Sequence, residues 1–216
     1  MLLQLAIDKP EQFAVLLQVR DFVDIVEVGT PVLKRFGLSA IATARELSGG
    51  KPILADTKTV DGGALEAEMV FSAGASLMTV LSNAAPATHD AVNTVAERHR
   101  AHVIADTIVD TGPPASPNQF PNRYAYVGLH MPTDVRAKHG GSTEHIAAVA
   151  DLRLLGYQVS LAGGLGPEHM EAVVQAAPSI VVVGSAITEA SNPRGVAEWI
   201  AQSLAQPGRG WPQERS

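Results

Sequence analysis

The chain has 216 residues, of which 46% are hydrophobic and 18% charged, and its formal net charge is −6 with histidine neutral. This apolar content can build a large core and argues against a disordered chain. The absence of cysteine excludes a disulfide framework, a thiolate zinc site, an iron–sulfur cluster and a cysteine nucleophile. The absence of any run rich in lysine and arginine argues against a nucleic-acid partner.

The first residues of the sequence and its longest apolar runs indicate where the protein is located. The apolar runs are well short of the roughly 20 residues that a membrane-spanning helix needs. The first eight residues lack the basic segment of a signal peptide and already contain a charge at Asp8. We therefore expect a cytoplasmic protein with no membrane partner.

Short apolar runs alternate along the chain with longer amphipathic stretches. The runs are typical of parallel strands buried on both faces, and they predict eight strands, at residues 2–7, 25–28, 52–55, 76–80, 102–105, 125–129, 158–161 and 180–183. The stretches between them predict helices at residues 10–19, 38–47, 64–73, 86–99, 142–155, 167–176 and 193–204. Pro10, Pro86, Pro167 and Pro193 each stand at a predicted helix start, where proline is favoured.

Two segments do not follow this alternation. Residues 109–123 contain four prolines and two asparagines and lack a helical period, which predicts a loop. Residues 206–216 are polar and rich in proline and glycine, which predicts a C-terminal tail.

Eight strand–helix units in 216 residues give about 27 residues each, close to the smallest (β/α)₈ barrel. We therefore predict a single TIM barrel over residues 1–205. A doubly wound open sheet shows the same alternation and is the alternative. The first strand argues against its dinucleotide-binding form, because Asp8, Lys9 and Pro10 follow it in place of a G-x-G-x-x-G turn.

Chemically capable residues follow nearly every predicted strand. In a (β/α)₈ barrel the catalytic groups stand at these carboxyl ends, which here carry Asp8, Glu27, Asp56 with Lys58, Thr79, Asp106, His130, Gly163 with Gly164, and Gly184 with Ser185. Any one aspartate here could equally be a helix cap or a turn former. The agreement of so many strand ends favours an active site.

The densest of these segments contains Asp56, Lys58 and Asp61. Asp56 and Lys58 are two residues apart, so an extended backbone directs them to the same side. A lysine between carboxylates stays protonated and can stabilise a developing oxyanion. The alternative is a surface ion-pair cluster at the start of the helix predicted at residues 64–73.

Glu27 lies inside an apolar run, where a carboxylate is costly to bury unless it is paired or binds a cation. Glu27 and Asp56 end consecutive strands and are therefore expected to be neighbours. Two carboxylates completed by water suit Mg²⁺ better than zinc. The alternative is an ion pair between Glu27 and Lys58 with no metal.

His130 is the histidine that ends an apolar strand, where its near-neutral pKa suits proton transfer. Asp134 is expected to orient it or to bind substrate. The glycine turns at residues 163–164 and 184–185 follow the last two strands, where barrels of this kind bind phosphate through backbone N–H groups. Simple tight turns are the alternative.

Together these residues resemble the orotidine-5′-phosphate-decarboxylase-type barrels, in the branch that holds 3-hexulose-6-phosphate synthase and 3-keto-L-gulonate-6-phosphate decarboxylase. The similarity runs from about residue 3 to residue 204. The segments that carry it are residues 5–8, 26–31, 56–61, 79–81, 162–164 and 183–187, with His130 and Asp134.

The resemblance implies a Mg²⁺-stabilised enediolate intermediate and a homodimer with shared active sites. It implies that Glu27 and Asp56 hold the metal, that Lys58 stabilises the enediolate and that His130 transfers the proton. Asp61 would reach the site of the neighbouring subunit. The remaining matched residues are expected to bind the phosphorylated sugar: Asp8, Thr79, Asp134, Gly163, Gly164, Gly184 and Ser185.

The two activities of this branch differ in their arginines. The decarboxylase pattern has arginine at the places of Met131, Thr133 and Ser185, which favours the synthase here. We therefore expect condensation of formaldehyde with ribulose 5-phosphate to give 3-hexulose 6-phosphate. The alternatives are a decarboxylase of 3-keto-L-gulonate 6-phosphate, a diverged lyase on another sugar phosphate, and a phosphate-binding barrel without catalysis.

Overall fold

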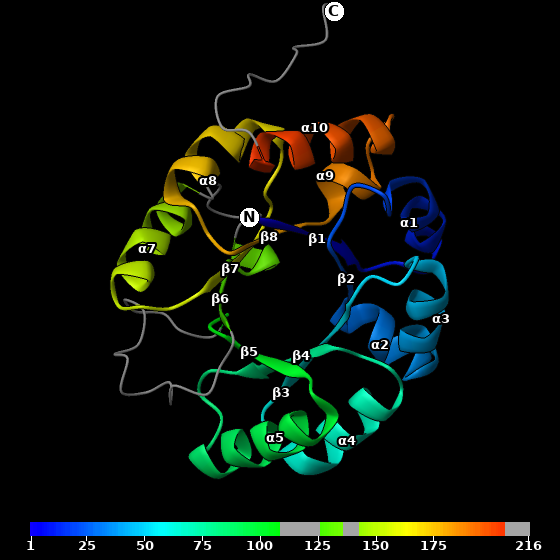
Figure 1. The fold of residues 1–216 in the computed structure, drawn as a ribbon, viewed down its shortest axis with the longest axis vertical. Helices are drawn as coiled ribbons and strands as arrows, with labels where there is room; N and C mark the ends of the chain where they lie inside the picture. The colour runs from blue at the N-terminus through cyan, green and yellow to red at the C-terminus, as the bar shows by residue number, and fades with distance from the viewer. Residues whose placement is uncertain (109–125, 136–142, 206–216) are drawn as a thin grey trace, which may run out of the picture.

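The computed structural model describes residues 1–108, 126–135 and 143–205. Its strands form one closed parallel barrel in sequence order, in which β1 pairs with both β2 and β8 (Figure 1). The strands are β1 Leu2–Ile7, β2 Ile25–Val28, β3 Ile53–Thr59, β4 Leu77–Leu81, β5 His102–Asp106, β6 Tyr126–His130, β7 Val159–Ala162 and β8 Ile180–Val183. This closure confirms the predicted TIM barrel and excludes the open doubly wound sheet.

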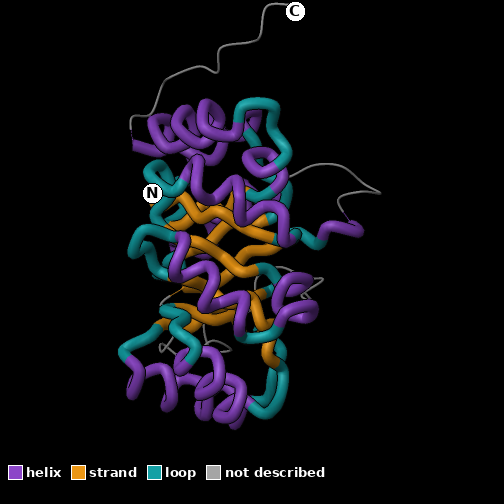
Figure 2. Tube along the Cα trace, turned by 90° about the vertical axis from the view of Figure 1, so that its right-hand side faces the viewer, coloured by secondary structure: helices purple, strands orange, loops and turns teal. Residues whose placement is uncertain are grey.

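Helices surround the barrel on its outside (Figures 1 and 2). Their bounds are η1 Pro10–Gln12, α1 Phe13–Val19, α2 Thr30–Phe36, α3 Ser39–Leu47, α4 Gly63–Ser72, α5 Pro86–His99, α7 Thr143–Leu154, η2 Pro167–His169, α8 Met170–Ala176, α9 Ser185–Thr188 and α10 Pro193–Ala205. The four prolines predicted to start helices are the first residues of η1, α5, η2 and α10. Within the described residues, no helix is both long and apolar enough to cross a membrane.

Two helices and one strand differ most clearly from the sequence-based expectation. Helices α2 and α9 were not predicted, because seven and four residues are too few to show a clear helical period. Strand β3 was predicted to end at Ala55 but continues to Thr59, so Asp56 and Lys58 belong to the strand itself. The predicted loop at 109–123, the tail at 206–216 and the first residue of the helix predicted at 142–155 lie outside the described residues.

The alternation of side chains along each strand separates two apolar layers. On β1, Leu3, Leu5 and Ile7 pack outward against the helices in the main core. The inward positions form a second, smaller cluster at the centre of the barrel: Ala6, Ile25, Leu54, Leu77, Ile104, Ile180 and Val182. Above this apolar centre, the inward positions near the carboxyl ends of β2 to β6 are polar: Glu27, Asp56, Thr79, Asp106 and His130.

Candidate active site

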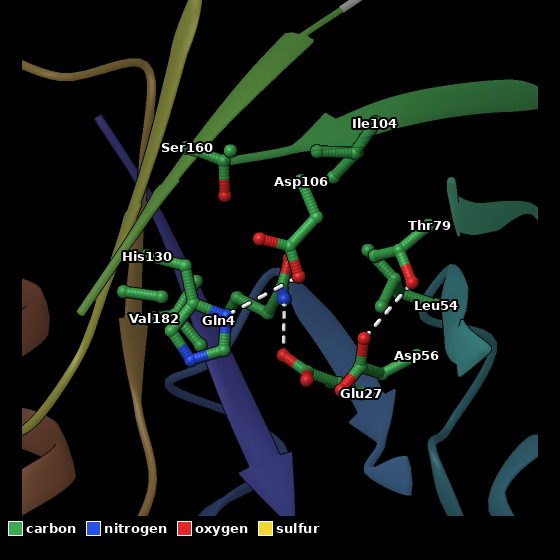
Figure 3. Close-up of a pocket in the computed structure, with 12 residues that line it drawn as sticks. Gln4, Glu27, Leu54, Asp56, Thr79, Ile104, Asp106, His130, Ser160 and Val182 are labelled. Carbon is green, nitrogen blue, oxygen red and sulfur yellow. Dashed lines mark hydrogen bonds and ion pairs between the residues drawn. The ribbon is translucent and has the colours of Figure 1, made fainter. Parts of the chain in front are cut away.

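A small cavity opens at the carboxyl ends of the strands. Every strand of the barrel contributes an inward-facing residue to it (Figure 3). The lining residues are Gln4, Glu27, Leu54, Asp56, Thr79, Ile104, Asp106, Gly128, His130, Ser160, Ala162 and Val182. Four residues predicted for the site, Glu27, Asp56, Thr79 and His130, therefore share one cavity.

Three side chains donate hydrogen bonds to the Asp56 carboxylate. Thr79 Oγ1 donates to Oδ1 at 2.9 Å, and Thr30 Oγ1 donates to Oδ2 at 2.8 Å. Lys58 Nζ also donates to Oδ2, at 2.5 Å. Asp56 is thus fixed from β4, from α2 and from its own strand. Thr79, which was expected to bind substrate, uses its hydroxyl to position Asp56 and accepts a hydrogen bond from Lys58 N at 2.9 Å.

A kink in β3 brings Lys58 to Asp56 and Asp106, two carboxylates that line the cavity. The Lys58 φ of 50° lies in the left-handed region, and the pairing between β3 and β4 shifts register between Ala55 and Thr59. The sequence analysis correctly predicted that Lys58 and Asp56 converge, but it assumed a regular extended backbone. The structure reaches the same convergence with a strained residue, a feature that concentrates at functional sites.

Lys58 lies between two carboxylates, because its Nζ is also 3.4 Å from Asp106 Oδ2. Burial alone would lower the pKa of Lys58, but the charges of Asp56 and Asp106 outweigh burial and raise that pKa above its ordinary value. The ammonium group therefore stays protonated at neutral pH. A protonated lysine can stabilise an oxyanion but cannot act as a free amine nucleophile.

Asp106 links Lys58 to the histidine. Its Oδ2 is 3.3 Å from His130 Nδ1, and the residue is only 3% exposed (Figure 3). Burial would raise the pKa of Asp106, but its contacts with His130 and Lys58 lower it. Burial likewise would lower the pKa of His130, but the hydrogen bond and the charge of Asp106 raise it. The sequence analysis noted Asp106 at its strand end but gave it no role.

Glu27 lies beside this cluster with a different set of partners. Its Oε2 accepts a hydrogen bond from Gln4 Nε2 at 2.6 Å. Burial, followed by the neighbouring charge of Asp56, raises the pKa of Glu27 to about 8. The alternative ion pair between Glu27 and Lys58 is absent from the described part of the chain, since Lys58 pairs with Asp56 and Asp106 instead.

The donor set of Glu27 and Asp56 fits Mg²⁺. The charge of Asp56 helps to raise the pKa of Glu27, so a divalent cation in place of the proton would stabilise the Glu27 carboxylate beside Asp56, and oxygen ligands suit Mg²⁺. No group of three or more acidic or histidine side chains in the described ranges is arranged to hold a metal. Glu27 and Asp56 could therefore supply two ligands, leaving the other positions to substrate and water.

Asp8 follows β1 at the mouth of the barrel, which is the end where the carboxyl ends of the strands meet. Its neighbours there are the ends of β2 and β8. A Cβ atom added to Gly29 would lie 2.1 Å from Asp8 Oδ1 and 2.9 Å from the backbone oxygen of Ile7. On the other side, a Cβ atom at Gly184 would lie 3.9 Å from Asp8 Oδ2. Glycine at position 29 is therefore what allows the Asp8 carboxylate to occupy its place.

The two predicted glycine turns adjoin the same mouth. Gly163 and Gly164 have φ values of 120° and 73°, which few other residues adopt. A Cβ atom at Gly163 would lie 2.7 Å from Met131 Cβ, so this turn packs directly on the residue that follows His130. Gly184 precedes the short helix α9, which begins at the exposed Ser185.

Asp61 and Asp134 are predicted site residues that lie apart from the contacts described above. Asp61 is exposed between β3 and α4, and Asp134 is exposed beyond β6. Neither lines the cavity. An aspartate that serves a neighbouring subunit would be expected to lie outside its own chain's site, so the position of Asp61 is compatible with that expectation.

Comparisons with known proteins agree on one family. A family model described as orotidine 5′-phosphate decarboxylase / HUMPS family matches residues 1–200. The 3-hexulose-6-phosphate synthase of Mycobacterium gastri is 32% identical over 209 residues, which cover 95% of this chain and 100% of the relative.

Two solved structures extend the comparison. The crystal structure of 3-hexulose-6-phosphate synthase from Salmonella typhimurium has a TM-score of 0.85 and 34% identity, covering 95% of this chain and 99% of that one. The 3-keto-L-gulonate-6-phosphate decarboxylase from Vibrio cholerae has a TM-score of 0.81 and 25% identity, covering 98% of this chain and 99% of that one. Both proteins resemble this chain over nearly their whole length.

Proposed function

The chain belongs to the orotidine 5′-phosphate decarboxylase / HUMPS family of enzymes, which act on phosphorylated sugars, and from that premise we propose that it condenses formaldehyde with ribulose 5-phosphate to form 3-hexulose 6-phosphate. Two observations support the synthase over the decarboxylase. Relatives at 32% and 34% identity carry the synthase name. Met131, Thr133 and Ser185 stand where the decarboxylase pattern has arginine.

The observation that carries the proposal is the chain of contacts from Asp56 through Lys58 and Asp106 to His130. In the proposed reaction, the His130 imidazole takes a proton from C1 of ribulose 5-phosphate, and an enediolate forms. The enediolate carbon then attacks the carbonyl carbon of formaldehyde and forms the new C–C bond. His130 returns its proton to the alkoxide that this attack creates.

Asp106 and Lys58 have separate tasks in this scheme. Asp106 accepts a hydrogen bond from His130 Nδ1 and so leaves Nε2 as the proton acceptor. Lys58 places a fixed positive charge beside the enediolate, and its pairing with Asp56 and Asp106 keeps it protonated. Mg²⁺, held by Glu27 and Asp56, would supply further positive charge to stabilise the same anion.

The remaining residues are proposed to hold the sugar phosphate. Backbone N–H groups near Gly164 and Ser185 would receive the phosphate, as in other barrels of this kind. Asp8, which lies near Gly184, would accept hydrogen bonds from substrate hydroxyls, and Asp134 would contact the substrate from beyond β6. An acidic protein can bind an anion in this way, because binding depends on local donors rather than on net charge.

Solvent-deuterium exchange into C1 of ribulose 5-phosphate, measured by NMR with and without Mg²⁺, tests the proton-transfer step alone. We expect exchange that requires Mg²⁺ and that is lost in His130→Gln, together with formaldehyde consumption when both substrates are present. Binding of the pentose phosphate without exchange would indicate a phosphate-binding barrel without catalysis. Release of CO₂ from 3-keto-L-gulonate 6-phosphate, faster than formaldehyde is consumed, would indicate the decarboxylase.

We also propose a homodimer in which Asp61 serves the partner's site. Mixing two inactive variants, Asp61→Ala and Lys58→Ala, should restore activity by forming heterodimers with one intact site. Random exchange makes about half of the dimers heterodimers, which gives roughly a quarter of the wild-type activity. Native mass spectrometry verifies that subunits have exchanged. If activity does not recover after that exchange, then Asp61 functions in its own chain or the proposed dimer is wrong.

A further inference from the structure

Gln4 is a buried amide that adjoins the apolar cluster at the centre of the barrel, and the buried Ser160 lines the same cavity. Gln4 is 2% exposed and faces inward from β1. The inward residues around it, Ile25, Ile104 and Val182 among them, are apolar and pack as one cluster. An apolar side chain would fill this place as well, so packing alone does not explain the amide.

The two ends of the Gln4 amide differ in their contacts. Nε2 donates a hydrogen bond to Glu27 Oε2 at 2.6 Å (Figure 3). Oε1 is buried and has no hydrogen-bond partner among the described residues. A buried acceptor without a partner is unfavourable, and such a group points to a ligand that completes it.

We propose that Gln4 is a positioning residue for cation binding, which rests on the Mg²⁺ site proposed above. Its Nε2 fixes Glu27 Oε2, which leaves Oε1 of the same carboxylate to face the cation. The free oxygen of the amide accepts a hydrogen bond from a water molecule that the cation carries into the cavity. Hydrogen bonds of this kind to metal ligands commonly change metal affinity 10- to 100-fold when they are removed.

Binding of Mn²⁺ alone tests this role without depending on turnover. The dissociation constant is measured from the EPR signal of free Mn²⁺ for the wild type and for Gln4→Met, which keeps the length of the side chain but cannot donate. We expect Gln4→Met to weaken Mn²⁺ binding by about tenfold or more. Asn93→Leu is the matched control, because it removes another buried amide, whose Nδ2 donates to His89 O at 2.9 Å on α5, away from the cavity.

The outcomes separate Gln4 from the metal site itself. Equal dissociation constants for the wild type and Gln4→Met would overturn the inference, as would an equal loss in Asn93→Leu. If Gln4→Met does not fold, Gln4→Asn carries the test, because its amide is one methylene too short to reach Glu27 and should also weaken binding. If Glu27→Gln and Asp56→Asn both bind Mn²⁺ like the wild type, the proposed metal site fails and the role of Gln4 fails with it. If those two variants lose binding and Gln4→Met does not, only the role of Gln4 is overturned.

Discussion

The two sides of the barrel mouth are built in different ways. On the carboxylate side, which comprises Glu27, Asp56, Lys58, Asp106 and His130, every charged group is held by a side-chain contact to another strand or to its own. On the glycine side, which comprises Gly163, Gly164, Gly184 and Ser185, the geometry depends on backbone conformation and on the absence of side chains. In the proposed function, this difference corresponds to a division between residues that carry out the chemistry and residues that bind the phosphate.

This division predicts two kinds of kinetic effect. Groups that act on developing charge lower kcat when they are removed, whereas groups that hold a distant phosphate mainly raise KM. Substitutions on the two sides of the mouth should therefore be distinguishable by which constant changes.

The largest effect is expected from Lys58→Met. The substitution removes the positive charge beside the enediolate and leaves Asp56 and Asp106 without a common counter-charge. We expect kcat to fall by about 10³-fold. Lys9→Met is the control, because Lys9 is an exposed lysine paired with Glu189 at 2.6 Å, and it should retain nearly full activity. A Lys58→Met enzyme within tenfold of the wild type would contradict the assigned role.

Asp106→Asn is expected to lower kcat by about 10²-fold and to change its pH dependence. Asp106 raises the pKa of His130, and His130 must lose its proton before it can act as a base. Replacing the carboxylate lowers this pKa, so the acidic limb of the pH profile moves to lower pH. A reduced kcat with an unmoved limb would mean that Asp106 does not act through His130.

Ser185→Asp tests the glycine side. A negative charge at the start of α9 would repel the substrate phosphate, so we expect KM for the sugar phosphate to rise about tenfold, equivalent to about 1.4 kcal/mol, with kcat little changed. Gly164→Asp should act in the same direction, and Ser185→Ala should have little effect. An unchanged KM in both aspartate variants would place the phosphate elsewhere.

Gly29→Ala tests the position of Asp8, which lies where the two sides meet. The added methyl group would overlap Asp8 Oδ1 and displace the carboxylate, so we expect a several-fold rise in KM and a loss of about 1–3 kcal/mol in stability. In an Asp8→Ala background, the same substitution should no longer change KM. If it raises KM equally in both backgrounds, its effect does not depend on Asp8.

The last prediction concerns stability rather than catalysis, namely the pH dependence of the free energy of unfolding without divalent cations. The pKa of Glu27 is about 8 in the folded protein, above its ordinary value of 4.5. The folded state therefore retains a proton that the unfolded chain has released, and the free energy of unfolding falls as pH rises from about 4.5 to about 8. We expect Tm in EDTA to decline less over this range in Glu27→Gln than in the wild type. Equal declines would show that Glu27 does not titrate as its surroundings indicate.

The sequence by itself determined the architecture and most of the residues at the mouth. Eight apolar runs with helices between them predicted the closed barrel, which the pairing of β1 with β8 confirms. Glu27, Asp56 and His130 could be placed together because parallel strands bring their carboxyl ends to one edge, whatever their separation in the chain. Short elements such as α2 left too little periodic signal to be found.

The tertiary structure alone decided how these groups are connected. Asp106 and Gln4 follow apolar residues in their strands and carry no local motif, so their contacts with His130 and Glu27 depend on the register between neighbouring strands, which brings together residues 24 and 23 positions apart in the chain. The kink at Lys58 depends likewise on the shifted pairing of β3 with β4. A sequence pattern shows which face of a strand a residue occupies, but the hydrogen bonds and the shifted pKa values arise only when the barrel closes and fixes the distances across it.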